Sequence, residues 1–172
     1  MTYTDANTIH DPTTGQVIPA AWGDQIRANQ EFFVDPPACS IYSATAQTVA
    51  NGAATGVDLV AASENFDNDS MHSTSSATER ITCQTAGRYL LVATVNFASN
   101  TSGSRRVAFL LNGATTYGAS VAAPAPTNST VLTAVRAIIL VAGDYVTCNV
   151  WQTSGGNLDV TLVEFAATYL TR

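Results

Sequence analysis

The most reactive side chains in this sequence are two histidines and three cysteines, and their spacing limits the chemistry they can support. His10 and His72 each lie in a polar segment without a nearby cysteine or second histidine, so neither has the spacing of a metal-ligand pair. Cys39, Cys83 and Cys148 are far apart and form no CxxC motif, which argues against a zinc site and against a disulfide framework. We therefore expect three buried free thiols and no bound metal.

A short acidic segment offers oxygen atoms that could bind calcium. Residues 67–70 read Asp-Asn-Asp-Ser, and Glu64 lies close by. The segment lacks the glycine at the sixth position and the glutamate at the twelfth position of a helix-loop-helix calcium loop. The pattern therefore favours a solvated loop over a calcium site.

No motif of a known catalytic site is present. The sequence contains no GxSxG elbow, HExxH pair, Walker loop or GxGxxG loop. A glycan hydrolase needs two carboxylates that face each other across a groove, and nothing in the sequence places such a pair. Charged residues make up only 12% of the chain, which leaves few groups for acid and base work. We expect a non-enzymatic protein without a cofactor.

Charge and hydropathy exclude two further classes. The net charge is −6, all basic residues are arginine, and the densest basic cluster is the pair Arg105 and Arg106. A nucleic-acid-binding protein needs clustered basic side chains to neutralise several phosphates, so we expect no nucleic-acid partner. The first residues carry neither a basic start nor an apolar run, and no apolar stretch approaches the roughly 18 residues of a bilayer span. The sequence therefore predicts no signal peptide and no membrane segment.

Residues 1–37 predict an N-terminal arm that contains one helix over about 19–33. Proline is tolerated at a first helical position, as at Pro19, and the segment Asp35-Pro36-Pro37 ends the helix. A helix this short is marginal alone in water, so its apolar stripe must dock, either on its own domain or on a partner. The stripe consists of Ile18, Trp22, Ile26 and Phe33.

Residues 38–172 predict a single all-β domain, a ten-stranded sandwich or jelly roll. Short apolar or alternating runs, separated by Gly, Asn, Ser and Pro, recur through this region. The pair Asn112-Gly113 predicts a tight hairpin, because both turn residues need a positive φ. The ten expected strands are 38–44, 47–49, 57–62, 79–84, 88–98, 105–111, 114–122, 130–140, 144–153 and 158–170.

Three separated motifs, in residues 66–69 with 80–91, in 140–146 and in 164–170, resemble segments of the globular heads of the tumour-necrosis-factor/complement family. Residues 66–69 with 80–91 resemble a strand, a turn and a Gly-x-Tyr start of the next strand. Residues 140–146 resemble that family's leucine strand and Gly-Asp turn, and residues 164–170 its closing strand, with an alanine at 166 where the family has a small Ser or Gly neighbourhood. The resemblance covers 38–172 and implies a ten-stranded jelly roll that assembles as a homotrimer, with Phe165 and Tyr169 as candidates for the trimer axis.

The arm resembles something else. Residues 15–33 with Pro36-Pro37-Ala38 are similar to leader segments of structural proteins from tailed bacteriophages, and the absence of lysine fits the coding bias of phages that infect high-GC bacteria. This resemblance implies a virion structural protein, located on the outer surface of the particle. It also supplies a partner for the stripe, because Ile18, Trp22, Ile26 and Phe33 would then anchor the trimer to capsid or tail proteins.

Two locations on the particle follow as alternatives. The first is a trimeric capsid decoration protein. The second is a receptor-binding head at the tail tip, a minor tail protein for host attachment, whose loops 99–105 and 123–128 would contact a host cell-surface glycan or protein. Only Asp35-Pro36-Pro37 separates the anchoring helix from the head, whereas fibres that reach a receptor have a long shaft, so we favour the capsid.

Overall fold

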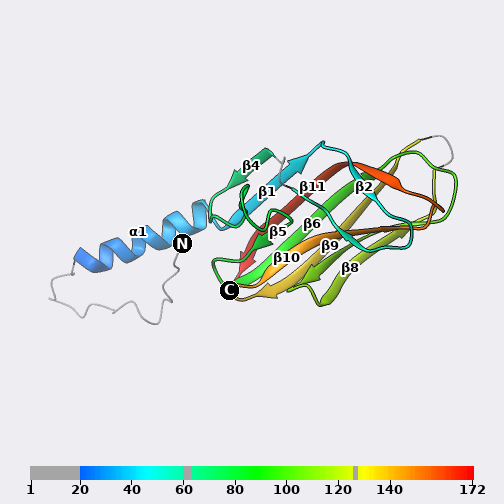
Figure 1. Ribbon diagram of the computed structural model, residues 1–172. Helices are drawn as coiled ribbons and strands as arrows, with labels where there is room; N and C mark the ends of the chain where they lie inside the picture. The colour runs from blue at the N-terminus through cyan, green and yellow to red at the C-terminus, as the bar shows by residue number, and fades with distance from the viewer. Residues whose placement is uncertain (1–19, 60–62, 126–127) are drawn as a thin grey trace.

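The computed structural model describes residues 20–59, 63–125 and 128–172, which form one helix and a two-layered β sandwich (Figure 1). Helix α1 spans Ala20–Val34, close to the predicted range, and projects from one end of the sandwich. Within the described residues, no helix is long and apolar enough to cross a membrane. We call the end that carries α1 the base and the opposite end the distal end.

The first sheet has the order β4-β1-β11-β6-β9, and β2 pairs with β11 beside this path. All of its pairings are antiparallel. Its central strand β6 alternates strictly between buried and more exposed residues, as expected for a strand with one face on a core. The strands are β1 (Ala38–Ser43), β2 (Gln47–Val49), β4 (Ser63–Asp67), β6 (Gly87–Phe97), β9 (Thr130–Leu140) and β11 (Leu158–Thr171).

The second sheet has the order β3-β10-β7-β8, with β5 also paired to β10. Aromatic and aliphatic side chains fill the space between the sheets, and the rings of Phe109 and Phe165 stack with centroids 5.8 Å apart. The strands are β3 (Thr55–Gly56), β5 (Arg80–Thr82), β7 (Arg105–Leu111), β8 (Thr115–Ala122) and β10 (Tyr145–Gln152).

The predicted hairpin is confirmed. Asn112 and Gly113 both adopt positive φ, at 50° and 69°, between β7 and β8. The turn is also fixed from outside, because the Asn112 side chain donates to Asp144 and accepts from the backbone N–H of Tyr145. Local turn chemistry and tertiary contacts therefore agree here.

The strand expected over 57–62 is wrong for its first half, and its last residues, 60–62, lie outside the described part of the chain. Val57 and Leu59 are buried but belong to no strand, and the Val57 N–H donates to the Cys148 carbonyl. Two short strands, β3 and β4, flank this segment instead, so the described residues hold eleven strands. Strand β4 is mostly exposed and lacks alternation, which is why no apolar pattern revealed it.

Candidate assembly surface

The outward side of β9 exposes an unusual number of large apolar side chains. Val131, Val135 and Ile139 lie four positions apart and are 58%, 54% and 66% exposed. Residues an even number of positions apart lie on one face of a strand, so these three side chains form one row with Thr133 and Ala137 between them. A contiguous exposed apolar surface on a sheet is typical of an interaction site.

Two rows of uncharged side chains continue this surface onto the strands beside β9, and they are flanked by Arg88, next to Ile139, and by Glu164, next to Thr94. In register across the sheet, Val135 lies next to Val92 of β6, which in turn lies next to Ala166 of β11. The neighbouring row holds Ala137, Leu90 and Thr168. Charged residues are depleted at the core of protein interfaces. We call these two rows, with Val131 and Ile139, the uncharged band.

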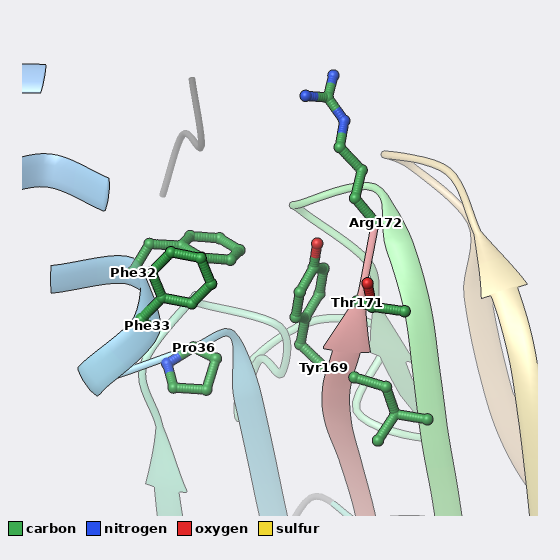
Figure 2. Close-up of a pocket in the computed structure, with 7 residues that line it drawn as sticks. Phe32, Phe33, Pro36, Tyr169, Thr171 and Arg172 are labelled. Atoms are coloured by element: carbon green, nitrogen blue, oxygen red, sulfur yellow. The ribbon is translucent and has the colours of Figure 1, made fainter. Parts of the chain in front are cut away.

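A groove of about 310 Å³ lies at the base, between the end of α1 and the end of β11 (Figure 2). The ring of Phe32 meets the ring of Tyr169 edge to face at a centroid distance of 5.1 Å, and Tyr169 meets Tyr89 in the same way. Phe33, on the adjacent side of the helix, is 70% exposed, and Leu170 is also exposed. The base therefore presents apolar side chains beside a helix that is docked at one end.

The linker between α1 and β1 is fastened to the sandwich through Asn68. The Asn68 amide group donates to Asp35 and to the Pro36 carbonyl, and its oxygen accepts from the Ala38 N–H. The Tyr169 N–H donates to the Pro37 carbonyl from the other side. Helix α1 is therefore held in a set orientation relative to the head.

The segment considered for calcium has structural partners. Both carboxylate oxygens of Asp67 accept backbone N–H groups, from Met71 at 2.9 Å and His72 at 2.8 Å. Asn68 holds the linker, and the described residues contain no group of three metal-ligating side chains. Asp67 ends strand β4, and its oxygens already accept backbone donors, so they do not form an open ligand set.

The buried histidine has a structural place as well. His72 Nδ1 lies 2.7 Å from a Glu64 carboxylate oxygen, and Nε2 lies 3.1 Å from the Thr78 carbonyl. The ring therefore joins the edge strand β4 to the loop before β5. His10 lies outside the described residues.

All three cysteines are buried and free, as expected. Burial raises the pKa of Cys83 to about 11 and that of Cys148 to about 12, and burial with nearby Asp67 and Glu64 raises the pKa of Cys39 further. A thiol that stays protonated is a poor nucleophile and metal ligand. The cysteines act as small apolar residues of the core.

The distal end is organised by two buried polar side chains. The Arg105 guanidinium donates to the carbonyls of Ser102, Ser104 and Asn100, and burial lowers its pKa. Gln152, paired with Arg105 across β7 and β10, donates to the Val49 and Gly156 carbonyls. Loops that follow β2, β6 and β10 are thus held from inside.

The structure separates the residues that the sequence suggested as sites. Phe165 is 1% exposed and its ring stacks on that of Phe109. Its side chain therefore lies in the core of one chain and does not line a contact between chains. Tyr169 lies at the base and is half-buried against Phe32.

The helix stripe also differs from the expectation. Phe32, which the stripe omitted, is the buried residue of the described helix, whereas Phe33 is exposed. Trp22 and Ile26 are half-buried, and Ile18 lies outside the described residues. Two adjacent phenylalanines give no signal in a single sequence as to which one faces the head.

No family model matches this sequence, and no curated protein matches it either. Solved structures with a similar fold are known. The globular domain of zebrafish complement 1qA protein has 16% sequence identity and a TM-score of 0.59, with 79% of this chain and 98% of that chain covered. The fold is a tumour-necrosis-factor/complement jelly roll.

Two further structures support the same fold. Murine APRIL has 12% identity and a TM-score of 0.58, covering 78% of this chain and 98% of that chain. Eiger TNF from S. frugiperda has 12% identity and a TM-score of 0.54, covering 79% and 95%. The jelly-roll fold expected from the three motifs is therefore confirmed, with eleven strands among the described residues and not the ten expected, although at these identities the similarity concerns the fold alone.

Proposed function

We propose that this protein is a non-enzymatic, homotrimeric structural protein on the outer surface of a tailed-bacteriophage particle, where it decorates the capsid. The jelly-roll heads contact one another through the uncharged band, and the N-terminal arm, residues 1–37, attaches the trimer to the particle. The observation that carries the proposal is the exposure of Val131, Val135 and Ile139 beside two uncharged rows of the same sheet face.

The energetics support self-association over a solvent-exposed role for this face. Removing apolar surface from water contributes roughly 25 cal/mol per Å², so a row of exposed valines and isoleucine favours burial. A closed ring of copies buries such a face on every chain, which is the common solution for soluble homo-oligomers. The placement on a phage rests on the resemblance of residues 15–38 to phage leader segments.

Light scattering on the full chain tests the trimer. We expect a mass three times the 18.0 kDa of one chain. Val135→Asp places a charge in the uncharged band and should produce monomers. Val121→Asp is a matched control, because Val121 is at least as exposed as Val135 but lies on β8 of the second sheet. A monomeric wild-type protein at micromolar concentration would contradict the proposal.

Electron microscopy of the particle tests the location. Gold-labelled antibody against this protein should mark the capsid faces. Label that is confined to the tail would instead support attachment to a host receptor.

The receptor-binding reading has one observation in its favour. Loops 99–105 and 123–128 join strands at the distal end, opposite α1, and the first loop is held in place by the buried Arg105. Residues 126–127 of the second loop lie outside the described part of the chain. Binding of the purified protein to host cells, lost on exchanging these loops but kept in Val121→Asp, would favour this second function.

A further inference from the structure

Helix α1 is too short to be stable through its own hydrogen bonds. It has 15 residues, and isolated helices of that length are marginal in water. Phe32 is the buried side chain of the described helix, and it anchors only the last turn on the head. Trp22 and Ile26 lie nearer the start of the helix and are half-buried in the single chain, so packing against another molecule would bury them further.

The spacing on α1 fits a seam between helices. Trp22, Ile26, Asn29 and Phe33 are separated by four, three and four positions, which is the d-a-d-a order of a heptad repeat. Asn29 is the one polar side chain at these four inner positions. The stripe thus has the period expected for contact with another helix.

The charges of α1 support a helical partner of the same kind. Asp24, Arg27 and Glu31 occupy the outer b and f positions of this heptad frame. Arg27 lies 3.3 Å from Asp24 and 3.9 Å from Glu31 within its own chain. The positions that flank the seam hold Gly23, Gln25, Gln30 and Phe32 and carry no charge. Identical helices can therefore approach one another without like-charge repulsion.

The attachment of α1 to the head determines how copies would meet. Asn68 and Tyr169 fix the linker, so α1 moves with the head as one body. In a ring with a single rotation axis, all copies of α1 are parallel and the same residue of each chain lies at the same height. Exposed Phe33 and Leu170 both line the groove at the base, so apolar side chains of the helix and of β11 lie on the two sides of one groove.

We propose that α1 packs against α1 of the other copies and forms a parallel helical stem below the heads, with Trp22, Ile26, Asn29 and Phe33 facing the axis. This inference rests on the proposed trimer. It revises the expectation that these side chains touch the particle directly, and it leaves the charged outer face of α1 toward solvent or the particle.

Cysteine cross-linking in the full chain tests the stem. In Ile26→Cys, identical positions meet at the seam, so mild oxidation should give a covalent dimer on a non-reducing gel. The matched control is Arg27→Cys, one residue away on the outer face. The seam variant should cross-link about ten times faster, because a disulfide requires Cα atoms about 4.4–6.8 Å apart. Cys39, Cys83 and Cys148 are buried and give no background.

Phe33→Cys repeats the test one heptad later, at a side chain that is exposed in the single chain, so the head stays intact. Fast cross-linking at both seam positions supports the stem. A trimer by light scattering in which Ile26→Cys and Phe33→Cys cross-link no faster than Arg27→Cys overturns the stem and leaves the proposed trimer standing. If the two seam variants cross-link no faster than Arg27→Cys and binding to the particle protects the seam residues, the stripe contacts the particle. That outcome also overturns the stem. A monomer overturns both proposals.

Discussion

The two ends of the sandwich are stabilised by different means. At the distal end, Arg105 and Gln152 are buried and donate hydrogen bonds to loop carbonyls. At the base, aromatic rings and the Asn68 side chain hold the helix and linker, and Phe33 and Leu170 remain exposed. The distal end holds its loop carbonyls through side chains of the same chain, whereas the described residues of the base leave apolar surface exposed.

The largest expected effect concerns the hydrogen bonds from buried Arg105 to the loop carbonyls of the distal end. Arg105→Ala should lower the free energy of unfolding by about 3 kcal/mol or more, because it leaves three loop carbonyls without their donor and each costs about 1–3 kcal/mol. Arg106→Ala, on the outward side of the same strand, should change it by less than about 0.5 kcal/mol. Urea unfolding at a fixed chain concentration measures both, and equal losses would show that the two ends do not differ as described.

The second prediction concerns the contact of the Phe32 ring with Tyr169, which holds α1 on the base. Phe32→Ala should cost about 2 kcal/mol, since it removes a buried ring from the periphery of the core. The loss should be local, with faster hydrogen exchange in α1 and unchanged exchange in β6. Val34→Ala is the control, because Val34 is highly exposed at the same end of the helix. Uniformly faster exchange over the whole sandwich would contradict a separately held base.

Loss of the Asn68 hydrogen bonds to the linker between α1 and β1 should have a smaller effect on stability. Asn68→Ala removes hydrogen bonds to Asp35, Pro36 and Ala38 and should cost about 1–2 kcal/mol. Limited proteolysis should then cleave near the linker. Asn65→Ala on the same edge strand removes one exposed contact to Ser40 and should leave the linker resistant. Equal cleavage of the two variants would mean that the Asn68 hydrogen bonds do not orient α1.

The core between the two ends should respond to alkaline pH. A thiol whose pKa in the folded state is raised keeps its proton while the unfolded chain loses it above pH 9.0. Stability is therefore full below pH 9.0 and falls as pH rises toward the folded pKa of about 12 for Cys148. The fall should reach about 1.4 kcal/mol per pH unit for one thiol.

Cys148→Ala should make this alkaline decline shallower, as measured by urea unfolding at several pH values. Thr147→Ala, on the neighbouring position of β10, keeps all three thiols and should keep the wild-type slope. A slope that is the same in both variants would show that Cys148 ionises equally in the folded and unfolded states.

Strongly periodic segments were predictable because their pattern reflects a single buried face. The alternation of β6, the Asn112-Gly113 turn and the helix limits all follow from local chemistry and agree with the structure. Strand β4 was not predictable, because an exposed edge strand forms through pairing with β1 and not through its own apolar pattern.

The candidate surface shows the same division. The sequence by itself determined the fold class, the free cysteines and a helix with an apolar stripe, because composition and period act locally. Only the tertiary structure decided that Phe32 and not Phe33 meets the head, and that Phe165 fills the core. It alone also brings Val135, Val92 and Ala166 into one uncharged row. Which side of a chain is buried depends on residues far away in sequence, and their positions are set by strand register and not by local propensity.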